Sequence, residues 1–129
     1  MAAEVLVNDG GAPARILPFV SAATGSAGDP VIIDTAGKTA ALVAGYAVAG
    51  VLLTDVDAVG DLANVVMGHG CILKVNCKSD VAIGNVLQSG TARLDGAANS
   101  ANAGDGVEVV GIALEAAGGT EQPIKVLMF

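Results

Sequence analysis

Short runs in which apolar residues alternate with other residues follow one another along the chain. In PIKVLMF every second residue is apolar and Lys125 lies on the opposite face; in LANVVMG the alternate residues are again apolar, with Asn64 opposite them. Side chains of a strand point to its two faces in turn, so this period of two predicts half-buried strands. The residues predicted to share the buried faces are Ile124, Val126 and Met128 in the first run and Ala63, Val65 and Met67 in the second.

The other strand-like runs are similarly short and follow at short intervals. They are PVIID, KTAALV, YAVAGVLL, CILKVNC, NVLQSG, TARLDG and VEVVGIALE, and the segments between them are rich in Gly, Asn and Ser. No window gives a convincing helical period, although SDVAIG is compatible with one helical turn capped by Ser79 or Asp80. Regularly spaced short strands predict an all-β fold, a small barrel or sandwich of short antiparallel strands with little helix.

The first eighteen residues have a different character. EVLV is compatible with one short strand, whereas NDGGAP is turn chemistry, because glycine accepts positive φ and proline interrupts regular pairing. We therefore expect an extended N-terminal arm over residues 1–18, which is either an edge strand or a segment that docks onto a neighbour. The rest of the chain, residues 19–129, is expected to form a single compact β domain.

Two parts of the chain resemble each other. GVLLTDVDAVGDLANVVMG (50–68) aligns without a gap with GIALEAAGGTEQPIKVLMF (111–129), at an offset of 61 residues, and AGDPVII resembles IGNVLQS at a slightly different offset. The identities fall on the predicted strands, which indicates two pseudo-repeated β units, at about 25–78 and 79–129. The identical pairs are Gly50/Gly111, Leu53/Leu114, Val65/Val126 and Met67/Met128.

Three aspartates in DVDAVGD are a candidate for chemistry. A calcium loop of the EF-hand type starting at Asp55 would need an oxygen ligand at its fifth position and Glu at its twelfth, where this chain has Val59 and Val66. The second copy of the repeat has AAGGTEQ in the same place, so the strands match while the acids do not. We predict a solvated turn at Asp55, Asp57 and Asp61, with a weak cation site as the alternative.

Composition limits the partners that the chain can have. The net charge is −7, and a nucleic-acid binder would need clustered Lys and Arg instead. Only three aromatic residues are present, and Ala and Gly bury little area, so we expect a homo-oligomer. The longest uncharged run, Thr39 to Thr54, falls short of the ~20 residues that span a bilayer, and the N-terminus has no secretory signal pattern. We expect no membrane association.

Cys71, Cys77 and His69 are the remaining reactive candidates. The two cysteines would lie ~20 Å apart in a straight strand, too far for a disulfide with each other, and their spacing is not that of a zinc site. Buried, reduced thiols are the interpretation we adopt, although a small Cys/His enzyme built on His69 and Cys71 is an alternative. No phosphate-binding loop or paired-carboxylate motif occurs. We expect no catalytic residues, no cofactor and no metal ion.

Several of these motifs together resemble a known family. The segments Val31–Lys38, Val48–Leu52, Thr54–Asp61 and Ala63–Gly68 look like the strand and turn pattern of lambda-type head decoration proteins of tailed bacteriophages. IGNVLQSGTARLDG, VVGIALEAAGG and the final VLMF are similar to a related group of capsid cement proteins. The resemblance covers most of residues 25–129. The chain resembles each type in one of its two β units, so neither pattern fits it from end to end.

The resemblance implies a fold and a function. It implies a β-tulip-like fold and a homotrimer that is made in the host bacterial cytoplasm, binds the outer surface of an icosahedral capsid and stabilises the expanded shell. The partner would be the major capsid protein, and the protein would not be an enzyme. In the family an N-terminal arm grips the shell, so the capsid-contact candidates are Ala2, Ala3, Glu4, Val5, Leu6 and Arg15. The alternative function is a ligand- or carbohydrate-binding β module on a virion or cell surface. Sugar sites usually present aromatic side chains, and this chain has only three, which disfavours the alternative.

Overall fold

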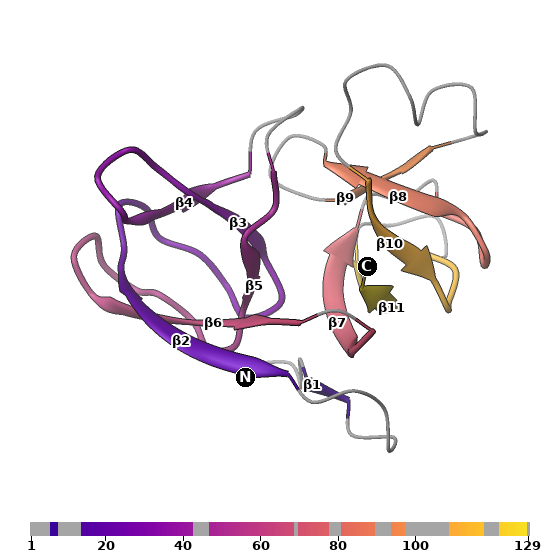
Figure 1. Ribbon diagram of the computed structural model, residues 1–129, viewed down its shortest axis with the longest axis horizontal. Coiled ribbons are helices and arrows are strands. Elements are labelled where there is room, and N and C mark those ends of the chain that lie inside the picture. Colours follow the sequence, from indigo (N-terminus) through magenta and orange to yellow (C-terminus); the bar gives the residue numbers. More distant parts are fainter. Residues whose placement is uncertain are drawn as a thin grey trace.

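The computed structural model describes residues 6–7, 14–42, 47–68, 70–77, 81–89, 94–97, 109–117 and 122–128 (Figure 1). Over these ranges the protein is all-β, as predicted, and contains no helix. The described residues therefore include no helix that is long and apolar enough to cross a membrane. The strands are β1 (Leu6–Val7), β2 (Arg15–Val20), β3 (Pro30–Ile33), β4 (Thr39–Ala41), β5 (Gly50–Leu52), β6 (Leu62–Met67), β7 (Ile72–Cys77), β8 (Val86–Ser89), β9 (Leu94–Ala97), β10 (Val109–Ala113) and β11 (Gln122–Met128).

The strands form two sheets. The first sheet has the order β2-β6-β5-β3-β4, and the second has the order β1-β7-β11-β10-β8-β9. Figure 1 shows them as two groups of strands, with the short connection from β6 to β7 leading from one to the other. All strand pairs are antiparallel except for one parallel contact, Cys77 with Leu94, between β7 and β9. Because this contact is a single residue pair, the second sheet curls back on itself without forming a closed barrel, and the architecture is that of a small sandwich.

The same topology occurs twice. Strands β2 to β6 follow the order β2-β6-β5-β3-β4, and strands β7 to β11 follow the equivalent order β7-β11-β10-β8-β9. The register agrees residue for residue with the sequence offset of 61. Val51 pairs with Val66 as Ile112 pairs with Leu127, and Leu52 pairs with Val65 as Ala113 pairs with Val126. We call strands β2–β6 unit 1 and strands β7–β11 unit 2.

A second offset relates the first strands of the two units. At an offset of 56, β2 corresponds to β7 and β3 to β8: Ile16 lies opposite Val66 as Ile72 lies opposite Leu127. The parallel bridge between Ser21 and Thr39 is the unit 1 counterpart of the contact between β7 and β9. The offset changes because the connection from β9 to β10 is longer than that from β4 to β5. This explains the two offsets found in the sequence.

A glycine marks the same close approach in both units. A Cβ atom at Gly50 would lie 2.5 Å from both Val65 Cγ1 and the Val66 carbonyl oxygen on β6. A Cβ at Gly111 would collide with the equivalent carbonyl oxygen, that of Leu127 on β11, and would lie 2.9 Å from Val126 Cγ1. Only a residue without a side chain lets the neighbouring strand pack this tightly, which accounts for the shared glycine in the repeat.

The apolar core confirms the predicted strand faces and adds one feature. Ala63 and Val65 of β6 are fully buried, as are Ile124 and Val126 of β11. Val66, on the opposite face of β6, is also fully buried, because it belongs to a cluster that contains residues of both sheets. The opposite face of the first sheet has its own smaller cluster. The two units therefore share one core cluster, and β6 is covered on both faces.

The predicted division into an arm at 1–18 and a β domain at 19–129, with repeats at about 25–78 and 79–129, stays a prediction. Residues 15–18, assigned to the arm, form the beginning of β2 and pair with residues 64–67 of β6. The change from the first sheet to the second falls between Met67 and Ile72.

Candidate protein-binding site

The outer edge of β7 is covered at both of its ends. Near its start, β1 adds to the sheet as an antiparallel strand, with Leu6 opposite Leu73 and Val7 opposite Ile72. Near its end, the backbone N–H of Asn76 donates a hydrogen bond of 2.8 Å to the carbonyl oxygen of Gly28 in unit 1. The N-terminal segment and a turn of unit 1 therefore both use the edge of unit 2.

The turn that reaches Asn76 comprises residues 26–29. Asp29 Oδ2 accepts a hydrogen bond from the N–H of Ser26 (2.9 Å), and Gly28 has a φ of 94°, which only glycine adopts readily. Asp29 Oδ1 accepts a further hydrogen bond of 2.6 Å from Asn76 Nδ2. Asn76 is only 8% exposed, so its amide is a buried polar group that this contact satisfies. The carboxylate thus orders the turn and joins the two units.

Along Arg15–Val20 the equivalent outer edge, on β2, has no neighbouring strand among the residues that the structure describes; directly after it, Ser21 forms the parallel bridge with Thr39 of β4. Hydrogen bonds of 2.9–3.0 Å between Ser21 and the loop before β6 direct the backbone groups of Ser21 inward. Along an antiparallel strand, the backbone N–H and C=O groups of successive residues point alternately to the two neighbouring sides. The backbone groups of Ile16, Pro18 and Val20 therefore point away from β6, toward the outer edge. Proline has no N–H to donate, and its presence is typical of edge strands. Ile16 and Val20 are left as the donors of this edge.

Large aliphatic side chains accompany this edge. Ile16 and Val20 are each 47% exposed, and Leu62, the cross-strand neighbour of Val20 on β6, is 61% exposed. Unpaired backbone groups are a template for a further chain, and apolar side chains beside them favour protein as the partner. We call Ile16, Pro18, Val20 and Leu62 the β2 edge surface. It is the best candidate for a binding site in the described residues.

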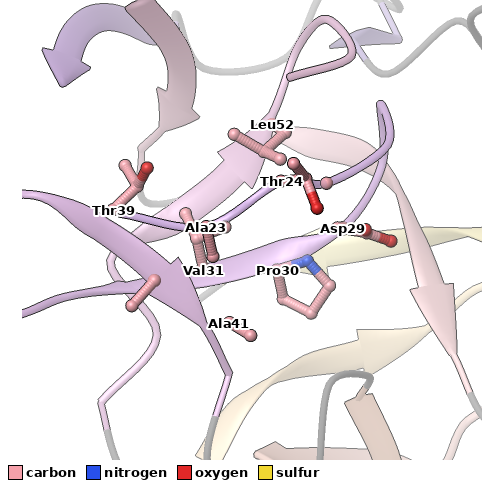
Figure 2. Close-up of a pocket in the computed structure, with 10 residues that line it drawn as sticks. Ala23, Thr24, Asp29, Pro30, Val31, Thr39, Ala41 and Leu52 are labelled. Atoms are coloured by element: carbon pink, nitrogen blue, oxygen red, sulfur yellow. The ribbon is translucent and has the colours of Figure 1, made fainter. Parts of the chain in front are cut away.

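A small pocket lies in unit 1 (Figure 2). Its volume is about 170 Å³, and its wall comes from the segment 23–25, β3, β4, β5 and Asp29. Both carboxylate oxygens of Asp29 already accept hydrogen bonds, from Ser26 and Asn76. Pockets for ordinary small ligands measure roughly 300–1,000 Å³ and usually carry aromatic side chains. The lining here consists mostly of small residues and contains no aromatic side chain, so this pocket offers little to a sugar.

The three aspartates of DVDAVGD lie in the connection between β5 and β6 and are exposed. Asp55 Oδ1 accepts a hydrogen bond of 2.8 Å from the N–H of Ala27. Within the described ranges, no group of three or more His, Cys, Asp or Glu side chains is arranged to hold a metal ion. The segment is thus a solvent-exposed connection, and one of its acids holds the turn that contacts unit 2.

Cys71 and Cys77 are both buried thiols, as the sequence predicts. Cys71 Sγ donates to the carbonyl oxygen of Gly68 at 3.2 Å, and burial raises the pKa of the Cys71 thiol, because the thiolate would lose its hydration. A raised pKa lowers the fraction of the reactive thiolate. His69 lies outside the described residues, so the proposed pairing of His69 with Cys71 gains no support.

The predicted capsid contacts fall in different places. Ala2, Ala3, Glu4 and Val5 lie outside the described residues, whereas Leu6 is paired in β1, and Arg15 is exposed at the start of β2 opposite Met67. The β2 edge surface was not predicted. Its signal in the sequence is the dipeptide Ile-Leu, which occurs at 16–17 and again at 72–73 and marks the two equivalent edges.

Comparison of the chain with protein-family models and with curated proteins finds no match. The resemblance to decoration proteins rests on the strand and turn motifs alone.

Proposed function

We propose that this protein is a structural virion protein that binds the outer surface of an icosahedral phage capsid as a homotrimer and stabilises the expanded shell. The observation that carries the proposal is the β2 edge surface, where an outer strand edge with no neighbouring strand in the described residues and exposed aliphatic side chains favour contact with protein, as a homotrimer requires. The motif resemblance supplies the identity of the partner, the major capsid protein.

Strand addition is the binding mode that we propose for the N-terminal arm. It uses backbone hydrogen bonds and needs few special side chains, which agrees with a chain poor in aromatic and basic residues. Pairing of β1 with β7 supports this mode, since it is itself the addition of an N-terminal strand to a sheet edge. Ala2, Ala3, Glu4 and Val5 precede β1 in the sequence and would contact the capsid, and Arg15 would contribute a cation to the contact. Three arms on one trimer would engage three sites at once, so that modest single contacts give stable attachment.

Co-sedimentation with expanded capsids that lack the protein tests this proposal. The full-length chain should be a trimer by native mass and should pellet with the capsids, whereas deletion of residues 2–5 should reduce binding and leave the mass unchanged. This deletion spares β1 and β2, so a loss of binding reports on the arm. A monomer that stays in the supernatant with capsids at micromolar concentration would contradict the proposal. Binding to a glycan array by such a monomer would favour the alternative function, a carbohydrate-binding module.

A further inference from the structure

Within the chain, the turn 26–29 of unit 1 docks on the edge of β7 in unit 2, whereas the equivalent turn 82–85 and the β2 edge surface show no such contact among the described residues. We propose that copies of the protein associate head-to-tail: the turn 82–85 of one copy docks on the β2 edge surface of the next, as the turn 26–29 docks on β7 within the chain. This inference deepens the homotrimer part of the proposed function and rests on that part alone, not on capsid binding.

The free turn of unit 2 has the conformation of the docked turn of unit 1. The N–H of Ala82 donates to Asn85 Oδ1 (2.8 Å), as that of Ser26 donates to Asp29 Oδ2. The N–H of Gly84 donates to the Ala113 carbonyl (2.8 Å), and the N–H of Gly28 donates to the equivalent carbonyl in β5 at the same distance. The φ angles of the two glycines, 94° and 84°, also agree. The second turn is therefore preformed for the contact that the first turn makes.

The surroundings of the two turns differ. A Cβ at Gly28 would lie 3.3 Å from Asn76 Nδ2, whereas a Cβ at Gly84 would meet nothing within 4 Å. Ala27 is 6% exposed, while its counterpart Ile83 is 70% exposed. A large apolar side chain thus occupies the tip of the turn that has no partner among the described residues.

The two free surfaces have complementary chemistry. Val20 is the counterpart of Asn76, so the N–H of Val20 corresponds to the N–H that bonds Gly28 within the chain. In the contact between copies, this N–H would donate to the Gly84 carbonyl of the neighbour. The polar pair formed by Asp29 and Asn76 would be replaced by apolar packing of Ile83 against Val20 and Leu62. Burying these three side chains gives the association a hydrophobic driving force.

Such an interface joins different surfaces of the two copies, so repetition produces either a closed ring or a filament. Three copies would place six equivalent β units in a ring, which agrees with the homotrimer proposed above. The β2 edge would then be covered by the neighbouring copy, and residues 2–5 would remain the contact for the capsid.

Native mass spectrometry of two single variants tests the proposal. Val20→Asp damages the edge and Ile83→Asp the turn, so each should lower the mass from three chains to one. Val59→Asp is the matched control, because Val59 is 66% exposed in another loop, and it should leave the mass at three chains. An equimolar mixture of Val20→Asp and Ile83→Asp should give a dimer, because each variant contributes the intact half that the other lacks. Far-UV circular dichroism verifies that each variant keeps its β structure.

Disulfide trapping gives a second readout that does not depend on a disruptive variant. In Val20→Cys/Ile83→Cys, oxidation should link each copy to the next and yield covalent three-chain rings. A wild-type monomer, or a trimer that both aspartate variants leave intact and that the cysteines do not link, would overturn the proposal. Dissociation caused by deleting residues 1–5, but not by Ile83→Asp, would assign the edge to the arm of another copy and would also overturn it. Capsid binding is measured separately by co-sedimentation. Loss of capsid binding by an intact head-to-tail trimer would contradict the proposed function alone. Capsid binding by a protein that is not a head-to-tail trimer would contradict the present proposal alone.

Discussion

Replacing Asp29 by alanine should destabilise the protein more than the same replacement of Asn85. The two residues occupy equivalent turns, and each side chain accepts a hydrogen bond from a backbone N–H of its own turn, at 2.9 Å and 2.8 Å. Only Asp29 also accepts the 2.6 Å hydrogen bond from Asn76 Nδ2. The difference between the two variants therefore isolates the contact between the units, because the loss within the turn is common to both.

The expected difference follows from the chemistry of this contact. A hydrogen bond to a charged group contributes about 1.5–3 kcal/mol to stability. Asp29→Ala leaves the amide of Asn76 without this acceptor, and because Asn76 is only 8% exposed, water can replace the lost hydrogen bond only in part. We expect the free energy of unfolding to fall by about 1.5 kcal/mol more in Asp29→Ala than in Asn85→Ala.

Urea unfolding followed by far-UV circular dichroism measures this difference, since the chain has no Trp for fluorescence. A double-mutant cycle between Asp29→Ala and Asn76→Ala should give a coupling energy of about 1–2 kcal/mol. The matched cycle between Asn85→Ala and Asn76→Ala should give a value within about 0.5 kcal/mol of zero. Equal destabilisation by the two turn variants, or equal coupling in the two cycles, would refute the reasoning that Asp29 joins the units.

Three further predictions concern the repeat, the thiols and the acidic segment. Gly50→Ala and Gly111→Ala should each lower the free energy of unfolding by about 1–3 kcal/mol in urea titrations, because a Cβ would collide with the neighbouring strand; an unchanged midpoint would contradict the close approach. Burial raises the pKa of Cys71 in the folded protein above the value of about 8.5 that the thiol has in the unfolded chain. Below about pH 8.5 the thiol is protonated in both states, and its contribution to the free energy of unfolding is fully present. This contribution is lost as the pH rises through the folded pKa, because the unfolded chain gives up its proton first. The urea midpoint should therefore fall above pH 8.5, and the fall should be smaller in Cys71→Ala. Asp55→Ala should lower the free energy of unfolding by about 1 kcal/mol, because the Asp55 carboxylate accepts a backbone hydrogen bond from Ala27. Asp57→Ala should lower it by less than about 0.5 kcal/mol. Equal effects of the two variants in thermal or urea unfolding would contradict the role given to Asp55.

The all-β fold, the buried faces of single strands and the repeat at an offset of 61 could all be predicted from the sequence. Each depends on local information: the period of two within a strand, and the turn residues that end it. The buried faces of β6 and β11 were correctly placed for this reason. That Val66 is also buried could not be predicted, because it depends on the cluster that covers the second face of β6.

The candidate site could not be predicted, since the local sequence does not say which strand edges remain open. Ile-Leu lies near the start of both β2 and β7, yet β1 pairs with β7 and not with β2. The two glycine turns have the same backbone conformation, yet one is buried against Asn76 and the other is exposed. The sequence by itself determined the strands, the turns and their repetition, through interactions between near neighbours. Only the tertiary structure decided which turn meets which edge, because that contact joins Asp29 to Asn76, 47 residues apart, and depends on how the two units pack.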